Sequence, residues 1–244
     1  MGKRILANMY QDILQAKLEK QKLLAILVDP DKVSLEALPT LIAKIKESPA
    51  THLFVGGSSV KENTIDVLVQ YLKTELSIPI VLFPGNPSQI STFADAILFL
   101  SLLSGRNPDY LIEHHVTAAP MLEKTALEII STGYILIESG SKTAVERISQ
   151  TKPLNRTNIE YVCHTALAGT YLGNKLIYLE AGSGAKFPVP LEMIHKVAET
   201  IAVPLLVGGG IKSQKEIQDA FQNGADMVVI GTAFENNPNF FNHD

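Results

Sequence analysis

Short hydrophobic runs recur along the whole chain and are separated by longer amphipathic segments. The runs lie at eight places: Leu23–Val28, His52–Val55, Ile80–Phe83, Ala96–Leu100, Tyr134–Ile137, Leu176–Leu179, Pro204–Val207 and Met227–Ile230. Most of them are continuously hydrophobic rather than alternating, which is typical of parallel strands that are covered on both faces. The pattern therefore predicts a parallel sheet.

The segments between most of these runs are predicted to be helices because their apolar residues recur every three or four positions. They are Leu35–Glu47, Thr64–Thr74, Asn158–Tyr171, Leu191–Ile201 and Lys215–Gln222, preceded by a charged amphipathic helix in the N-terminal 20 residues. Eight strands with helical crossovers predict an α/β fold, a TIM (β/α)8 barrel. The connection PGNPSQISTFAD has room for one or two helical turns at most, so one barrel helix is expected to be shortened or replaced.

Length and composition favour one barrel over two small domains. The chain has 244 residues, and a barrel of this kind needs about 250. Apolar residues make up 46% and charged residues 19%, and no linker rich in proline, glycine or serine divides the sequence. We therefore predict a single globular domain over residues 1–244.

Charge and hydropathy narrow the classes of partner. The net charge of −4 and the lack of basic runs interleaved with aromatic residues exclude general binding to nucleic acid. The longest strongly apolar run, Ala96–Leu103, is too short to cross a bilayer, and the N-terminus lacks a signal-peptide core. We expect a cytoplasmic protein without stable membrane insertion. The single cysteine, Cys163, excludes an intramolecular disulfide and is interpreted as a small apolar helix residue.

Glycine-rich segments follow the last three predicted strands, where barrels of this class build their active sites. They are Gly182–Gly184, Gly208–Gly210 and Gly231–Thr232. Glycine lets backbone N–H groups approach an anion closely, and loops after strands seven and eight commonly bind phosphate. A tight turn explains the glycines at any one strand end, but three consecutive ends favour a phosphate site.

The first two predicted strands are followed by the oxygen-rich sequences DPDK (29–32) and GGSS (56–59). Carboxylates, hydroxyls and ligand phosphates supply the oxygen donors that Mg²⁺ prefers. A helix cap explains the two aspartates equally well, although Ser34 competes for that position. Lys32 and Arg106 could neutralise a diphosphate or could equally be solvated surface cations.

The segment YLEAGSGA (178–185) is the most specific in the sequence. Glu180 at a strand end is predicted to accept a proton from a substrate hydroxyl, and Tyr178 to position the substrate. A buried strand residue followed by a loop explains Leu179 well. It explains Glu180 poorly, because an unpaired carboxylate at a barrel rim is costly.

The chain resembles the geranylgeranylglyceryl phosphate synthase family in seven motifs: LVDPDK, FVGGSS, LFPGN, ILFLSLLSGRNPDYLI, YLEAGSGA, VGGGI and GADMVVIGT. The resemblance extends from about Leu23 to Glu235, nearly the whole chain. It implies a modified TIM barrel in which one helix is replaced. It also implies Mg²⁺-dependent transfer of a prenyl group from its diphosphate to the 3-hydroxyl of sn-glycerol 1-phosphate, which yields an ether-lipid precursor.

The resemblance also implies roles for particular residues. Asp29 and Ser58 would bind Mg²⁺ together with the prenyl diphosphate. Glycerol phosphate would be bound by Tyr178, Leu179, Glu180, Ala181, Gly182, Ser183, Gly184, Gly209, Gly210, Gly231 and Thr232. Homo-oligomers, either dimers or hexamers, and an apolar groove for the prenyl chain near the replaced helix are further implications.

Leu27 stands where members with a shorter, bacterial-type pattern carry lysine, two residues before the first aspartate. The chain therefore resembles the longer group that shares LVDPDK, and a geranylgeranyl donor is favoured over a heptaprenyl donor. Two other functions compete. One is an isomerase or lyase acting on a sugar or indole phosphate, which does not explain DPDK together with GGSS. The other is a non-catalytic sensor of a phosphate ligand, against which the retention of Glu180 and of the metal ligands argues.

Overall fold

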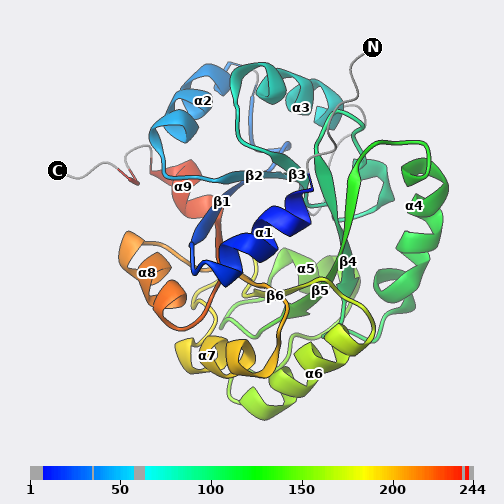
Figure 1. Cartoon of the computed structure of the whole chain (residues 1–244), viewed down its shortest axis with the longest axis vertical. Coiled ribbons are helices and arrows are strands. Elements are labelled where there is room, and N and C mark those ends of the chain that lie inside the picture. The colour runs from blue at the N-terminus through cyan, green and yellow to red at the C-terminus, as the bar shows by residue number, and fades with distance from the viewer. Residues whose placement is uncertain (1–7, 35, 58–63, 238–239, 242–244) are drawn as a thin grey trace.

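The computed structural model describes residues 8–34, 36–57, 64–237 and 240–241, which form a closed barrel of eight parallel strands (Figure 1). Each strand pairs with its neighbours in sequence, and β8 closes the ring on β1. The strands are β1 (Leu23–Val28), β2 (His52–Val55), β3 (Ile80–Leu82), β4 (Ala96–Leu102), β5 (Glu128–Leu136), β6 (Leu176–Glu180), β7 (Leu205–Gly208) and β8 (Met227–Ile230). The predicted TIM barrel is confirmed.

The predicted strand bounds hold for β1, β2 and β8, whereas β5 is longer than predicted. It begins at Glu128 rather than at Tyr134, because Ala96 to Leu102 of β4 pair with Glu128 to Tyr134 along their whole length. The early part of β5 contains serine, threonine and glycine, so its sequence does not read as an apolar run. Pairing with the neighbouring strand, rather than local hydrophobicity, extends β5.

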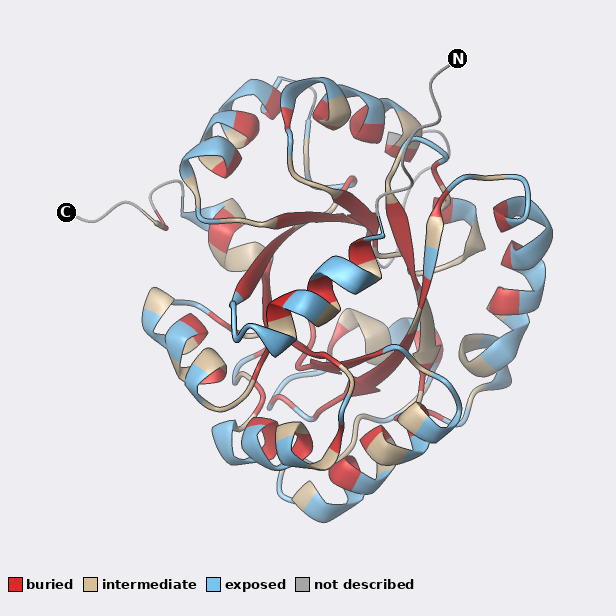
Figure 2. Cartoon of the chain, viewed as in Figure 1, coloured by how far each residue is buried: buried red, intermediate tan, exposed pale blue. Residues whose placement is uncertain are grey.

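The predicted helices cover the outside of the barrel, each with one buried face turned towards it (Figure 2). They are α2 (Leu38–Glu47), α3 (Thr64–Glu75), α6 (Ile159–Tyr171), α7 (Leu191–Thr200) and α8 (Gln214–Gln222). Four further elements were not predicted: a π-helical turn η2 (Asp109–Glu113), α4 (His114–Leu122), α5 (Ala144–Ser149) and α9 (Thr232–Asn236). α4 exposes apolar side chains and contains Pro120, which obscures its periodicity, and α5 and α9 are only 6 and 5 residues long.

The connection between β3 and β4 contains a single 3-10 turn, η1 (Pro87–Gln89), whereas β1, β2, β6 and β7 are each followed by a helix of at least 9 residues. Asn86 caps this turn, since its Oδ1 accepts hydrogen bonds from the Ser88 N–H at 2.9 Å and from the Ser88 hydroxyl at 2.6 Å. The predicted replacement of one barrel helix is therefore confirmed. Along the described chain, η1 and the π-helical turn η2 are the only helical elements between α3 and α4.

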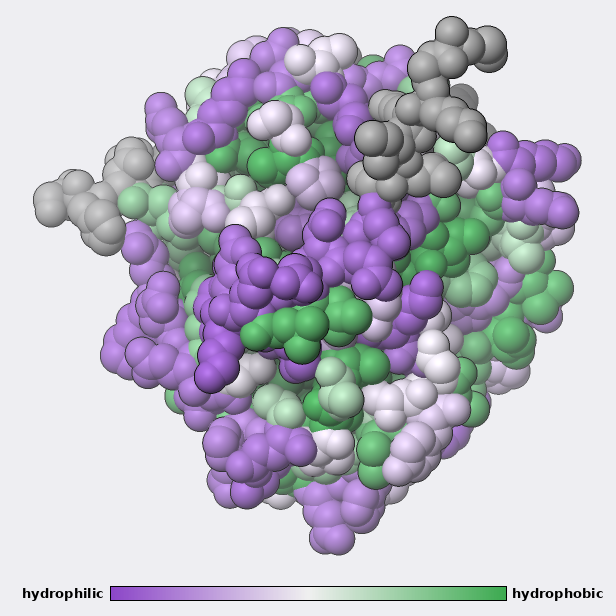
Figure 3. Space-filling model, in the orientation of Figure 1, coloured by the Kyte–Doolittle hydropathy of each residue, from purple (hydrophilic) through white to green (hydrophobic). Residues whose placement is uncertain are grey.

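Helix α1 (Met9–Leu18) lies across the N-terminal end of the barrel (Figure 1, dark blue). Its buried residues Met9, Ile13 and Ala16 join the side chains that fill the barrel interior. The Glu128 carboxylate accepts the backbone N–H groups of Met9 at 2.5 Å and Tyr10 at 3.1 Å. The outer face at this end is largely hydrophilic, with small apolar patches (Figure 3). In the described part of the chain, α1 covers this end of the barrel, and the cavity described below opens at the opposite end.

The strand side chains form two apolar layers, one inside the barrel and one between the barrel and its helices. Phe54 and Tyr178 belong to the inner layer, whereas Leu53 and Leu179, their sequence neighbours, belong to the outer layer. This arrangement follows from the alternation of side chains along a strand. Within the described part of the chain, no helix combines the length and apolarity that crossing a bilayer requires.

Candidate active site

A cavity of about 740 Å³ opens at the C-terminal ends of the strands. The side formed by the loops after β6, β7, β8 and β1 is lined by charged groups, hydroxyls and glycines. The side formed by η1, β4, α4 and α5 is mainly apolar, with Ile90, Phe99, Ala118 and Ile148 in its wall. One continuous cavity can therefore accommodate a polar group and an apolar group together.

Glu180, the last residue of β6, projects into this cavity and is only 6% exposed. Its Oε1 accepts a hydrogen bond of 2.6 Å from the Gly182 N–H. Tyr178 projects from the same strand to the same side, because it stands two residues earlier. Its hydroxyl is fully buried and has no hydrogen-bond partner within the described structure. A buried unpaired hydroxyl that faces a cavity is suited to bind a polar ligand group.

Burial controls the ionisation of this cluster. Burial raises the pKa of Glu180, and the hydrogen bond from Gly182 opposes that shift by favouring the carboxylate. Burial also raises the pKa of Tyr178 and Tyr134 well above the ordinary value, and the negative charge of Glu180 acts in the same direction. The two phenols are therefore neutral, and Glu180 is the group in this cluster that can accept a proton.

The glycines after β6, β7 and β8 line the same cavity, and Gly182, Gly208 and Gly209 lie against Glu180. Gly209 has a positive φ of 79°, and a Cβ atom at this position would overlap Glu180 Oε1. The Ser183 and Thr232 hydroxyls approach each other to 3.4 Å, which joins the β6 loop to the start of α9. The cavity is lined by these predicted residues: Tyr178, Glu180, Gly182, Ser183, Gly184, Gly209, Gly210, Gly231 and Thr232.

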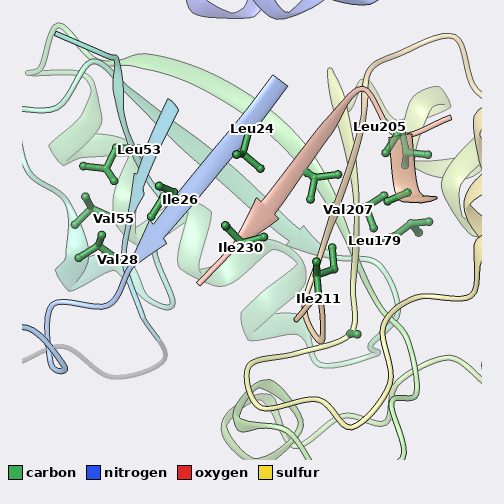
Figure 4. Close-up of a cluster of buried hydrophobic side chains, with 14 of the residues drawn as sticks. Leu24, Ile26, Val28, Leu53, Val55, Leu179, Leu205, Val207, Ile211 and Ile230 are labelled. Carbon is green, nitrogen blue, oxygen red and sulfur yellow. The ribbon is translucent and has the colours of Figure 1, made fainter. Parts of the chain in front are cut away.

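The structure does not bring Leu179 and Ala181 to the cavity. Both are fully buried in the outer apolar layer, and Leu179 lies beside Leu205 and Val207 (Figure 4). Neighbouring residues of a strand face opposite sides, so these two side chains cannot face the cavity that Tyr178 and Glu180 face. Ala181 contributes through its backbone, whose N–H donates to the Gly208 carbonyl at 3.0 Å.

Asp29 lines the cavity at the end of β1, whereas Ser58 lies outside the described residues. Asp29 Oδ1 accepts the Asp31 N–H at 3.1 Å, and Oδ2 lies 3.7 Å from the Lys32 ammonium. The same ammonium lies 3.4 Å from Glu235 of α9. Across the described ranges, no group of three or more His, Cys, Asp or Glu side chains could hold a metal ion. Asp29, Asp31 and Glu235 all line this edge of the cavity, and Asp29 is the one that directly follows β1.

Of the remaining predicted candidates, some line the cavity and others do not. Lys32 and Asp31 line the cavity, but Arg106 does not. Arg106 instead is exposed and donates to the carbonyls of Leu103 at 2.9 Å and Gly105 at 2.7 Å. This agrees with the alternative interpretation of Arg106 as a surface cation. Cys163 is buried in α6, as predicted for a small apolar residue.

Several cavity residues were not predicted from the sequence. Two of them, Phe83 and Tyr134, form an aromatic wall with the predicted Tyr178, with ring centroids 5.4 to 6.0 Å apart. His115 of α4 packs edge-on against Phe99 at 4.2 Å in the apolar side, and its burial lowers the pKa of its imidazole. Phe83 is the last residue of the predicted strand Ile80–Phe83 and directly follows the observed β3, so its place at a strand end could have indicated it.

Comparison with known proteins gives consistent matches over nearly the whole chain. A model of the PcrB family matches residues 16–243. The chain is 61% identical over 241 residues to geranylgeranylglyceryl phosphate synthase of Flavobacterium johnsoniae, covering 99% of both chains. It is 42% identical to the protein of the same name from Pyrococcus horikoshii, covering 91% of this chain and 87% of that one.

Two solved structures resemble this fold closely. The first is (S)-3-O-geranylgeranylglyceryl phosphate synthase from Thermoplasma acidophilum in complex with its substrate sn-glycerol-1-phosphate. It has a TM-score of 0.89 and 29% identity, covering 95% of this chain and 93% of that one. The second is wild-type GGGPS from Thermoplasma volcanium, with a TM-score of 0.85 and 32% identity, covering 93% and 92% of the two chains.

Proposed function

The chain belongs to the PcrB family, and from this premise we propose that it is a prenyltransferase acting on sn-glycerol 1-phosphate. It transfers a geranylgeranyl group from geranylgeranyl diphosphate to the 3-hydroxyl of glycerol phosphate, forming an ether-linked phospholipid precursor and diphosphate. The names of the relatives and the substrate bound to the Thermoplasma acidophilum enzyme support this function. The observation that carries it is a buried Glu180 between a glycine-rich polar side and an apolar side of one cavity.

The polar side suits glycerol phosphate. Backbone N–H groups at Gly209, Gly210 and Gly231 and the hydroxyls of Ser183 and Thr232 supply donors for the phosphate. Glu180 then lies where it can contact the 3-hydroxyl of the bound glycerol. The unpaired Tyr178 hydroxyl is a donor for the same substrate.

The apolar side suits the prenyl chain. The turn η1, β4 and α4 form this side, and Ile90, Phe99, His115 and Ala118 line that part of the cavity. An apolar chain bound there gains free energy from the surface that it removes from water, about 25 cal/mol per Å². The diphosphate end of the same molecule reaches Asp29 and Lys32 at the ends of the strands.

The reaction replaces one C–O bond with another. The bond between the allylic carbon and the diphosphate breaks, and its electron pair leaves with the diphosphate. The glycerol 3-hydroxyl oxygen forms the new ether bond to that carbon. Glu180 takes the hydroxyl proton, for which its raised pKa suits it. The neutral phenols of Tyr134 and Tyr178 border this region and exclude water.

We also propose that the reaction requires Mg²⁺. Mg²⁺ commonly binds one or two protein carboxylates and completes its shell with substrate phosphates and water. Asp29 fits this role as the carboxylate at the diphosphate edge of the cavity, and Ser58 remains a second predicted ligand. When bound, the metal would neutralise charge on the departing diphosphate.

The experiment that tests this function is incubation of the purified protein with geranylgeranyl diphosphate and sn-glycerol 1-phosphate, with and without Mg²⁺. The product is measured by mass. We expect an ether product that depends on Mg²⁺ and is not formed from sn-glycerol 3-phosphate. A heptaprenyl donor tests chain length in parallel. If no donor and neither enantiomer gave product, a phosphate sensor or a barrel isomerase would be the better reading.

A further inference from the structure

We propose that Gln89 is a positioning residue that fixes the diphosphate edge of the cavity. The inference rests on the proposed function, because it assigns Gln89 a role towards the prenyl diphosphate. Gln89 is the last residue of η1, the turn that replaces a barrel helix. Its side chain is fully buried, with 0% exposure, and it does not itself line the cavity.

The Gln89 side-chain amide joins two loops that do line the cavity. Its Oε1 accepts the Gly85 N–H at 3.0 Å and the Gly57 N–H at 3.4 Å, and its Nε2 donates to the Gly57 carbonyl at 2.9 Å. Gly57 follows β2 and Gly85 follows β3. One side chain thus holds both backbone groups of Gly57 and ties them to the loop after the next strand.

Gly57 in turn contacts the carboxylate of Asp29. A Cβ atom at Gly57 would lie 2.5 Å from Asp29 Oδ1 and 2.8 Å from Asp29 Cγ, so the bare backbone of Gly57 packs directly against the carboxylate. A shift of the Gly57 peptide therefore moves the surface against which Asp29 rests. Asp29 is also the proposed contact for Mg²⁺ and the diphosphate. The contacts run without a break from Gln89 through Gly57 to Asp29.

This arrangement explains why a glutamine occupies a fully buried site. A buried amide needs partners for its polar atoms, and among the described residues Gln89 finds them in backbone groups at the cavity edge. Groups that orient a metal-contacting side chain typically change metal affinity or activity by about 10- to 100-fold when they are replaced. We expect the effect of Gln89 to fall on the prenyl diphosphate and Mg²⁺, and not on glycerol phosphate, because the proposed phosphate donors follow β6, β7 and β8 and are not among the hydrogen-bond partners of Gln89 in the described structure.

The test compares Gln89→Met, which keeps the size and removes all three hydrogen bonds, with Gln89→Glu, which keeps the acceptor and removes the donor. We expect Gln89→Met to raise the KM for geranylgeranyl diphosphate and the Mg²⁺ concentration for half-maximal rate by about 10-fold. The KM for sn-glycerol 1-phosphate should change less than about twofold. Gln89→Glu should give a smaller increase in the same two constants. Because it retains the acceptor bonds, it also serves if Gln89→Met fails to fold.

A second readout does not depend on turnover. Calorimetric titration of geranylgeranyl diphosphate with Mg²⁺, without glycerol phosphate, should show a Kd that rises by a similar factor in Gln89→Met. The matched control is Asp95→Asn. Asp95 joins the opposite ends of β3 and β4 by accepting the Ile80 N–H at 2.8 Å, and it pairs with Lys73 at 2.8 Å. The control should lower thermal stability and leave both substrate constants unchanged.

Three outcomes would overturn the inference. In the first, Gln89→Met behaves like the control, with lower stability and unchanged constants. In the second, it raises the constants for both substrates equally, as a general loosening of the barrel would. In the third, the wild-type protein makes no product, which would overturn the proposed function and this inference with it. An active wild type with either of the first two outcomes removes the inference alone.

Discussion

At the scale of single residues, the chemistry depends on a carboxylate that is buried next to a polar cradle. Glu180 accepts a hydrogen bond from the Gly182 N–H and lies beside the Tyr178 hydroxyl on the same strand. Glu180→Gln keeps the shape and the acceptor for Gly182 but cannot take up a proton. We expect kcat to fall by about 10²- to 10⁴-fold, while calorimetry shows unchanged binding of sn-glycerol 1-phosphate. Full turnover with intact binding would remove Glu180 as the base.

The raised pKa of Glu180 predicts the direction of the pH profile. Glu180 acts as the carboxylate, and burial favours its protonated form, so the inactive form persists to higher pH than for an ordinary glutamate. Activity should therefore be lost as pH falls through this raised pKa and should level off above it. The measurement is kcat/KM for sn-glycerol 1-phosphate between about pH 4 and pH 8. A profile that is flat down to the ordinary glutamate pKa would contradict this assignment.

A substitution at Gly209 tests whether glycerol phosphate binding requires bare backbone beside Glu180. Gly209→Ala would strain a backbone with φ of 79° and place a Cβ against Glu180 Oε1 and the Gly182 N–H. We expect the KM for glycerol phosphate to rise at least 10-fold, about 1.4 kcal/mol of binding free energy. Gly173→Ala is the control, because Gly173 has φ of 91° but no atom within 4 Å of its added Cβ. Equal losses in the two variants would assign the effect to backbone strain alone.

At the scale of elements, α1 closes one end of the barrel, and a side chain of β5 caps its first turn. Glu128 accepts two N–H groups of the first turn of α1, as a helix-capping side chain does. We expect Glu128→Ala to lower the free energy of unfolding by about 1 kcal/mol. The KM values should stay unchanged, because the cavity lies at the opposite end. Glu19→Ala is the control, because Glu19 makes only an exposed contact with Gln15.

Apolar periodicity in the sequence was insufficient to predict one of the helices, α4. α4 faces the cavity with His115 and Ala118, yet it exposes Val116 and Met121, so its apolar residues do not form one stripe. Its apolar content is therefore spread around the helix, and the periodicity that reveals α7 and α8 is missing. The η1 turn was predicted only as a shortened connection. The role of Gln89 within it depends on bonds to Gly57, 32 positions away in sequence.

At the scale of the whole molecule, burial in the barrel disfavours the charged form of a side chain, and the lowered pKa of His52 shows this effect. His52 begins β2 and is 6% exposed, and burial lowers its pKa to about 4. The folded state keeps His52 neutral, whereas the unfolded chain binds a proton below about pH 6.5. Its contribution to stability is therefore present above pH 6.5 and is lost as pH falls towards 4, by roughly 3 kcal/mol in total.

Urea unfolding of the wild type and of His52→Leu at about pH 7, 5.5 and 4 measures this effect. The free energy of unfolding should fall more steeply with decreasing pH in the wild type than in the variant. Equal slopes would show that other groups account for the acid sensitivity. Fluorescence and circular dichroism should follow the same transition if the barrel unfolds as one unit.

The sequence by itself determined the order of strands, the barrel class, the replaced helix and the chemical character of the strand ends. These features are local: an apolar run, a glycine pair or a carboxylate after a strand is visible in a few consecutive residues. Asp29, Glu180 and the glycines of the cradle were found in this way, and they line one cavity.

The tertiary structure decided which side chains face that cavity. Both layers of the barrel are apolar, so the sequence does not reveal whether Tyr178 or Leu179 points inwards, and the closure of the ring fixes this choice. It also decided the length of β5, the closed end under α1, and the contact from Gln89 through Gly57 to Asp29. Each of these depends on pairing or packing between segments far apart in the chain, for which local sequence carries no signal.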